Sequence, residues 1–200
     1  MNSFIKITYP TYKRIGNFLS IVELNLLVRQ LEIHNHWQAH VNQQAYQGSW
    51  DVIALRAKKE FQNAHPILQC FSHESGDSKD EWTNLPIINQ YPPIKGLLSR
   101  MTCPIKSVRF MRLHGYSSIL PHRDPGVGLN SGEARLHIPI SFPHGTQFIV
   151  AGKSVPMIPG ELWYIDADRE HSVVNSSAEC RTHLVVDCIA NDWLKNMIVS

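Results

Sequence analysis

The chain has 200 residues, of which 43% are hydrophobic and 18% are charged, and its formal net charge at pH 7 is +2. This composition is typical of a globular domain and excludes an intrinsically disordered chain. Lysine and arginine are scattered along the sequence, so no basic stripe indicates a nucleic-acid partner. We therefore expect one domain over residues 1–200, with a single sizeable core.

The cysteines and the N-terminus indicate the compartment. Four cysteines form no C-x-x-C pair and no dense spacing, which argues against a zinc knuckle or a disulfide framework. The first residues, MNSFIKITYP, lack the charged and then apolar pattern of a signal peptide. No apolar run approaches the length of a membrane span. We therefore expect reduced thiols, a cytoplasmic location and no membrane partner.

The first half of the chain carries signals for both helices and strands. The clearest is a capping box of Ser20 and Glu23, which precedes leucines at helical spacing. Residues 72–84 are polar, charged and glycine-containing, so we expect a surface loop there and regard it as the best candidate for a lid. The predicted helices and strands of this half are helices at 21–33 and 94–101, and strands at 4–9 and 49–57.

From residue 107 onward the sequence reads as one short strand after another. Gly, Pro, Asn and Ser separate the apolar segments. Strands at such regular spacing indicate a sandwich or a barrel rather than alternating β-α units. The predicted strands are 107–114, 118–123, 134–142, 147–152, 161–166, 171–175 and 180–189.

His122 and Asp124 are the first candidates for a metal site. If the segment around them is extended, alternate side chains share a face, so these two residues point the same way. His171 would complete a set of two imidazoles and one carboxylate, which suits Fe(II) in non-haem oxygenases. Alternatively, Asp124 only caps the turn at the end of the strand, because an H-x-D pair often arises by chance.

Arg181 begins the most apolar of the predicted strands. A guanidinium in that position is costly to desolvate unless it meets an anion, and its fork matches a carboxylate in bidentate geometry. A dicarboxylate co-substrate needs such a partner. The alternative is a local ion pair with Asp187 or another acid. Most of the eleven histidines are expected at the surface, His40 among them, and His183 lacks motif support.

The run from Val108 to Asp192 resembles a known enzyme family. Its segments are, in order, VRFMRLHGYSSILPHRDPG, RLHIPI, GELWYIDADREHSVVN and CRTHLVVDCIAND. Together they are similar to the aspartyl/asparaginyl β-hydroxylase-like branch of the Fe(II)/2-oxoglutarate-dependent dioxygenases, which includes free-proline hydroxylases. The resemblance implies a mainly β fold with flanking helices, built on a double-stranded β-helix, or cupin-like jelly roll. Residues 1–106 would flank a jelly-roll core at 107–190.

The resemblance also implies roles for individual residues. The three candidate ligands would hold iron, and Arg181 would bind the distal carboxylate of 2-oxoglutarate. Arg135 and His137 match the R-x-H pair of the family, which lies near the carboxylate of the co-substrate or the substrate.

Four further residues are candidate substrate contacts. Asn175 matches an asparagine of a family motif, although the neighbouring acidic and aromatic positions differ here. Trp50 and Arg56 resemble the N-terminal portion of the family. A substrate with a carboxylate would need a second cation, for which Arg112 and Arg56 are candidates beside Arg135. Each of these arginines could instead be a solvated surface residue.

The implied reaction is hydroxylation of an unactivated C–H bond in an amino acid or amino-acid-like small molecule. It would use Fe(II), 2-oxoglutarate and O2 and release succinate and CO2. Asp124 favours a small substrate, because the animal aspartyl hydroxylases lack this carboxylate ligand. Three alternatives stay open: a hydroxylase of Asp, Asn or another residue in a peptide or carrier-bound substrate, a non-catalytic sensor of metal and 2-oxoglutarate, and a cupin-like isomerase or hydrolase.

Overall fold

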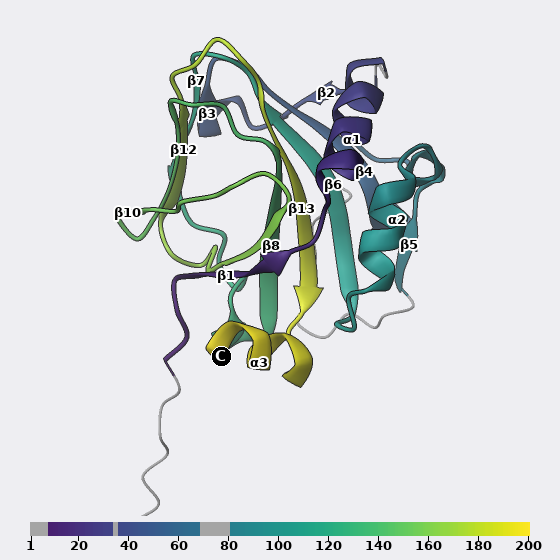
Figure 1. The fold of residues 1–200 in the computed structure, drawn as a ribbon, viewed down its shortest axis with the longest axis vertical. Helices are drawn as coiled ribbons and strands as arrows, with labels where there is room; N and C mark the ends of the chain where they lie inside the picture. The colour runs from purple at the N-terminus through teal and green to yellow at the C-terminus, as the bar shows by residue number, and fades with distance from the viewer. Residues whose placement is uncertain (1–7, 34–35, 69–80) are drawn as a thin grey trace, which may run out of the picture.

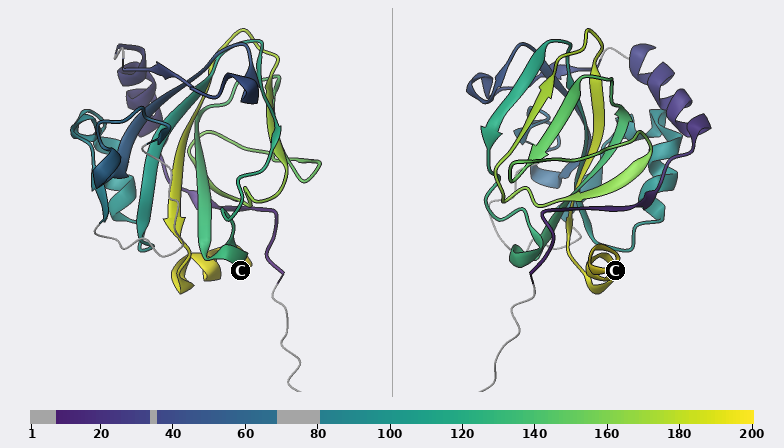
Figure 2. Two further views of the ribbon diagram at one scale, coloured as in Figure 1. Left: turned by 180° about the vertical axis from the view of Figure 1, so that it is seen from behind. Right: turned by 60° about the vertical axis from the view of Figure 1, so that its left-hand side comes forward.

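The computed structural model describes residues 8–33, 36–68 and 81–200. In these ranges the chain forms two antiparallel sheets that face one another, with two helices on the outer side of the larger sheet (Figure 1). The view from behind in Figure 2 shows the same order of helices, large sheet and small sheet. In the described ranges, no helix is long and apolar enough to cross a membrane.

The larger sheet has eight strands, in the order β1-β11-β8-β13-β6-β4-β2, and β5 pairs with β4. Its centre consists of three strands of nine residues each, β8, β13 and β6. The strands are β1 (Tyr12–Asn17), β2 (Gln38–Ala39), β4 (Trp50–Lys58), β5 (Trp82–Asn84), β6 (Ile105–Leu113), β8 (Glu133–Ser141), β11 (Glu161–Ile165) and β13 (Arg181–Ile189).

The smaller sheet has five strands, in the order β10-β9-β12-β7-β3. Strands of the two sheets alternate along the chain after residue 105, which is the arrangement of a jelly roll. The strands are β3 (Tyr46–Gln47), β7 (Ser117–His122), β9 (Thr146–Val150), β10 (Lys153–Ser154) and β12 (His171–Asn175).

The helices are α1 (Ile21–Ile33), α2 (Pro92–Ser99) and α3 (Asp192–Val199). The predicted capping box starts α1: the Ser20 N–H donates to Glu23 Oε2 at 2.8 Å, and the Glu23 N–H donates to Ser20 Oγ at 3.3 Å. Leucines at helical spacing then bury one face of α1 against the sheet. Short 3₁₀ segments lie at Gln43–Ala45, Lys59–Phe61, Pro86–Gln90 and Leu129–Ser131.

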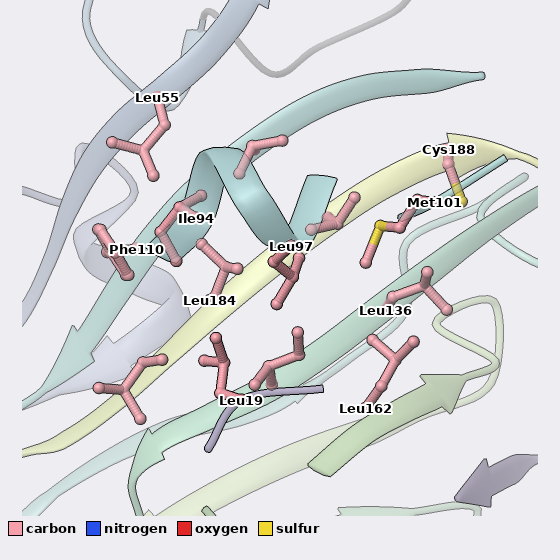
Figure 3. Packing of buried hydrophobic residues seen from close by; sticks show 14 of the residues in the cluster. Leu19, Leu55, Ile94, Leu97, Met101, Phe110, Leu136, Leu162, Leu184 and Cys188 are labelled. Atoms are coloured by element: carbon pink, nitrogen blue, oxygen red, sulfur yellow. The ribbon is translucent and has the colours of Figure 1, made fainter. Parts of the chain in front are cut away.

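The two faces of the large sheet hold different cores. On the outer face, apolar strand residues pack against the helices; Figure 3 shows Phe110, Leu136 and Leu184 beside Ile94 and Leu97 of α2. On the inner face, alternate residues of the same strands meet the small sheet. That inner cluster includes Met111, Ile119, Phe148, Val173 and Val185. Because side chains alternate along a strand, β6 and β13 contribute apolar residues to both cores, whereas β8 turns the polar Arg135 and His137 to the inner face.

Most predicted elements are confirmed, with ends that differ by one or two residues. The helix expected over 21–33 has those bounds, and α2 begins earlier than expected because prolines occupy its first turn. The elements β1 and α3 and the two-residue strands β2, β3 and β10 were not anticipated. The strand expected at 4–9 lies outside the described residues except for 8–9, which are not in a strand.

The loop expected over 72–84 needs a correction at its end. Residues 82–84 form β5, which pairs with β4 through Lys58↔Trp82 and Arg56↔Asn84. The rest of that prediction, at 72–80, lies outside the described residues. The segment before residue 107 is also more than a flank, because β4 pairs with β6 inside the large sheet.

Leu136→Ala should lower the free energy of unfolding by about 2–5 kcal/mol, because it leaves a cavity in the outer core. Leu136 is fully buried, whereas Ile158 is 59% exposed. Ile158→Ala is therefore the control and should change stability by less than about 0.5 kcal/mol. Urea unfolding followed by circular dichroism measures both variants. Equal losses of stability would contradict the packing of the outer core.

Candidate active site

Strands β7 and β12 bring two of the predicted ligands together. His122 pairs in register with His171, and the centroids of their imidazole rings are 4.2 Å apart. Residues directly opposite one another in antiparallel strands project to the same side of the sheet. Asp124 follows in the next turn, where its N–H donates to the Ala167 carbonyl at 2.9 Å. One ligand atom from each of the three residues lies within 4.8 Å of the others, so the predicted triad converges.

The hydrogen bonds of the two histidines prepare them to bind a metal. His122 Nδ1 lies 2.8 Å from the Leu120 carbonyl, and His171 Nδ1 lies 2.9 Å from the Arg169 carbonyl. Because a carbonyl only accepts, each Nδ1 carries the proton and each Nε2 presents a lone pair. Burial lowers the pKa of His171 to about 4, so this imidazole is neutral at pH 7. Two imidazole nitrogens and one carboxylate form a donor set that fits Fe(II).

Arg135 contacts the third ligand directly. Its Nη1 donates to Asp124 Oδ2, while its Nε donates to Asp187 Oδ1 at 2.7 Å. Burial raises the pKa of Asp124, but the charge of Arg135 opposes burial, and the pKa is lowered. The Asp124 carboxylate is therefore ionised at neutral pH, as a metal ligand must be.

Asp187 joins Arg135 to a second buried arginine. Arg109 Nη1 donates to Asp187 Oδ2 at 2.8 Å, and Ser107 Oγ donates to the same oxygen at 3.1 Å. Burial alone would raise the pKa of Asp187, yet Arg109 and Arg135 hold it far below its ordinary value. One buried carboxylate thus orients two guanidiniums on the inner face of the large sheet.

Arg181 is a buried cation of a different kind. Its exposed fraction is 2%, its Nη2 donates to His183 Nδ1 at 2.7 Å, and it lies over the Phe148 ring, 5.4 Å from the centroid. No carboxylate of the described residues pairs with it, and its Nε is buried without a hydrogen-bond partner. The alternative of a pair with Asp187 is not observed, because two other arginines occupy that carboxylate. Burial lowers the pKa of Arg181 to about 9, so the guanidinium stays protonated at pH 7.

A single cavity of about 570 Å³ connects the triad with Arg181. Its volume is in the range of small-molecule sites. Apolar side chains from both sheets form much of its wall, among them Met111, Ile119, Val173 and Val185. The predicted residues that line it are the triad, Arg135, His137, Arg181 and Trp50.

His183 is a candidate that the sequence reasoning missed. It is fully buried, accepts the Arg181 hydrogen bond, and its Nδ1 lies 3.4 Å from Nδ1 of His137. Burial and the charge of Arg181 hold the pKa of His183 well below its ordinary value, so the ring is neutral and Nδ1 is free to accept. The sequence did contain a signal for His183. Alternate residues of a strand share a face, so the predicted strand that begins near Arg181 places His183 on the same face as Arg181.

His40 corrects an expectation about surface histidines. His40 is only 9% exposed, and its ring stacks on the Trp50 ring with centroids 3.9 Å apart. The segment after β2 folds back onto β4, where the His40 N–H donates to the Trp50 carbonyl at 2.7 Å. Burial lowers the pKa of His40 to about 4. His40 and Trp50 together line the cavity with aromatic surface.

Two arginines predicted to contact substrate are not among the cavity-lining residues, which corrects that expectation. Arg56 donates to two backbone carbonyls and to Asn84 Oδ1. Arg112 pairs with Asp51 at 2.6 Å and lies over the Trp37 ring. Alternation explains Arg112, because its neighbour at position 111 faces the cavity.

Asn175 is also outside the cavity lining and holds a loop instead. Its side-chain amide donates to the carbonyls of His114 at 3.0 Å and Glu179 at 2.8 Å, while its Oδ1 accepts from Ser177 Oγ at 2.8 Å. It lies at the opposite end of β12 from His171. Its observed contacts are those of a structural residue.

The facing sheets, the converging triad and the buried Arg181 define a jelly-roll protein with a candidate site for Fe(II). The model of the family described as Aspartyl/Asparaginyl beta-hydroxylase matches residues 22–191. The chain belongs to this family. The resemblance found in the sequence is thereby confirmed, together with the jelly-roll fold that it implied.

Comparison with known proteins gives a distant relative of stated activity. The L-proline cis-4-hydroxylase of Rhizobium meliloti (strain 1021) is 25% identical over 142 residues, which are 70% of this chain and 48% of that protein. The chain therefore spans about half the length of this relative.

Solved structures share the fold at low identity. The epimerase SnoN of nogalamycin biosynthesis has a TM-score of 0.54 at 14% identity, covering 90% of this chain and 79% of its own. A prolyl hydroxylase from Trichoplax adhaerens has a TM-score of 0.52 at 11% identity, covering 94% and 86%. An oxidoreductase of the 2OG-Fe(II) oxygenase family from Burkholderia pseudomallei has a TM-score of 0.50 at 15% identity, covering 87% and 84%.

Asp124→Asn should weaken Fe(II) binding at least about tenfold, because the amide removes the negative charge from the donor set. Anaerobic calorimetric titration of Fe(II) into the purified protein measures the affinity. Asp168→Asn is the control, because Asp168 pairs with Arg123 outside the triad. An unchanged affinity in Asp124→Asn would contradict the assignment of this carboxylate as a ligand.

Asp187→Asn should lower the free energy of unfolding by about 3–5 kcal/mol at pH 7, because two buried guanidiniums lose their shared anion. The depressed pKa of the folded carboxylate stabilises the protein above the unfolded-state pKa of about 3.9, and this contribution is lost as the pH falls below that value. The difference in the free energy of unfolding between the wild type and Asp187→Asn should therefore be constant from about pH 7 to 5 and become smaller below about pH 4.

Urea unfolding at several pH values measures this difference, with Asp168→Asn as a matched surface control. A small difference at neutral pH, or a difference that becomes larger in acid, would contradict the role of Asp187.

Proposed function

We propose that this chain hydroxylates an unactivated C–H bond of an amino acid or amino-acid-like small molecule. The reaction uses Fe(II), 2-oxoglutarate and O2 and releases succinate and CO2. The observation that carries the proposal is the presence, in one cavity, of the ligand triad and of Arg181, a buried guanidinium without a carboxylate partner in the described part of the chain.

In this proposal the side chains in and beside the cavity have different roles. His122, Asp124 and His171 hold iron, which together with 2-oxoglutarate and O2 supplies the oxidising chemistry when bound. Arg181 binds the distal carboxylate of the co-substrate, because a desolvated guanidinium gains most from an anion in bidentate contact. His183 fixes one edge of that guanidinium by accepting from Nη2, so the remaining donors have a defined direction.

Arg135 and His137 stand as proposed contacts of the co-substrate. They occupy alternate positions on β8, and both line the cavity. His137 is neutral, because burial and the charge of Arg181 hold its pKa well below the ordinary value. Because its imidazole is neutral, His137 can contact a bound anion without adding a second buried positive charge to that of Arg181.

The apolar part of the wall has a chemical role as well. Met111, Ile119 and Val185 give the wall an apolar part beside its charged side chains. A cavity that excludes water strengthens the electrostatic contacts of bound ions and protects reactive species from side reactions. This is what hydroxylation of an unactivated carbon requires.

A small substrate is supported by the relative that hydroxylates L-proline. The cavity lies between the two sheets, and the stacked rings of His40 and Trp50 line part of it. An isomerase that uses no 2-oxoglutarate would not need a buried cation to bind a dicarboxylate.

Arg181→Gln should raise the dissociation constant for 2-oxoglutarate about 100-fold or more, because a buried charged contact is lost. Titration of 2-oxoglutarate into the anaerobic Fe(II) protein, followed by the visible charge-transfer band of the chelated keto acid, measures this constant. Arg112→Gln is the control, because Arg112 does not line the cavity. An unchanged constant in Arg181→Gln would refute the role of this residue.

Admission of O2 to the same samples separates an enzyme from a sensor. A hydroxylase releases succinate, and the release rises when its substrate is present in a panel of free amino acids. A protein that develops the band and never releases succinate would be a sensor, and the proposal would be wrong.

A further inference from the structure

We infer that the cavity contains a second carboxylate subsite, built on Arg109, which binds a carboxylate of the organic substrate. This inference rests on the hydroxylase function proposed above and adds the charge class of the substrate. It replaces Arg112 and Arg56, the arginines that the sequence offered for this task, with a residue that lines the cavity.

The hydrogen bonds of Arg109 leave one edge of its guanidinium unused. Nη1 donates to Asp187 Oδ2 and to Ser107 Oγ, both at 2.8 Å. Nε is buried without a partner, and within the described residues Nη2 has none either. The Nε and Nη2 atoms of a guanidinium form an edge that can donate two parallel hydrogen bonds to one carboxylate. The side chain is 7% exposed, so an anion at this edge would be largely shielded from water.

The position of Arg109 separates it from the site proposed for 2-oxoglutarate. On β6, Arg109 lies opposite Val185 of β13, whereas Leu113 lies opposite Arg181. Four residues of strand place the two arginines about 13 Å apart at the backbone, so their side chains begin at different parts of the cavity wall. Through Asp187 and Arg135, Arg109 is linked to Asp124. A carboxylate on Arg109 would therefore hold the substrate close to the metal ligands.

The charges around the cavity favour an anion as substrate. Four cationic side chains line it against three carboxylates, and iron would add two positive charges. The two carboxylates of 2-oxoglutarate offset only part of this excess, so one positive charge remains. Buried charge without a partner is costly, and a substrate carboxylate would neutralise it. The cations are Lys106, Arg109, Arg135 and Arg181, and the carboxylates are Asp124, Glu133 and Asp187.

The test compares each acid with its primary amide, which has nearly the same shape and no negative charge. Calorimetry measures the binding of free L-amino acids and their amides, beginning with L-proline and L-prolinamide, to protein loaded with Mn(II) and 2-oxoglutarate. At least one acid should bind the wild type about 10- to 100-fold more tightly than its amide, as expected for a charge-assisted bidentate contact.

Arg109→Gln should weaken the binding of that acid by a similar factor and remove the preference for acid over amide. Its affinity for 2-oxoglutarate should stay as in the wild type. Arg112→Gln is the matched control, because it removes another β6 arginine that pairs with an aspartate, outside the cavity lining. If Arg109→Gln does not fold, Arg109→Lys keeps a cation beside Asp187 and should still reduce the acid-to-amide ratio.

The inference is overturned if no acid of the panel binds the wild type more tightly than it binds the variant. It is also overturned if amides bind as tightly as acids. Failure of the proposed function has a different signature, because the wild type would then either not bind 2-oxoglutarate or bind it and release no succinate when O2 is admitted. A merely structural role of Arg109 would lower the unfolding temperature and leave the acid-to-amide ratio unchanged.

Discussion

The register of β7 against β12 is the constraint on which the site depends. It places His122 opposite His171, although 48 residues lie between them in the sequence. A slip of one residue would turn one imidazole to the other face of the sheet and destroy the triad. Ile119 and Val173 pair in the same two strands and bury their side chains in the inner core. The apolar pattern that folds the small sheet therefore also holds the metal ligands in position.

The inner face of the large sheet carries buried charged side chains, and their burial costs free energy. The apolar outer face has no such cost. Burial of several arginines is tolerable only because Asp187 lies between two of them and orients both. Among the described residues Arg181 has no such anion, and it contacts Phe148 and a neutral imidazole instead. An external anion should therefore stabilise the protein most when it binds at Arg181. The fold thus retains an uncompensated charge at the place where the co-substrate is proposed to bind.

The sequence predicted the strands after residue 107 because turn residues separate them at regular intervals. It also predicted the triad, since H-x-D at a strand end and a later histidine stand in motifs that resemble the family. It could not choose between Arg109 and Arg112, which lie on opposite faces of β6. Both faces of that strand are buried, so the polarity pattern does not mark the inner one. His40 was missed because only tertiary packing places it in the cavity, where its ring stacks on Trp50.

The two guanidiniums proposed to bind carboxylates differ in the group that orients each of them. Neutral His183 accepts from Arg181, so Arg181 keeps its full positive charge for a dianionic co-substrate. Anionic Asp187 accepts from Arg109 and offsets part of its charge. A carboxylate on Arg109 would therefore be held more weakly than one on Arg181. That order of affinities suits a site in which the co-substrate must be in place before the substrate positions its carbon beside the metal.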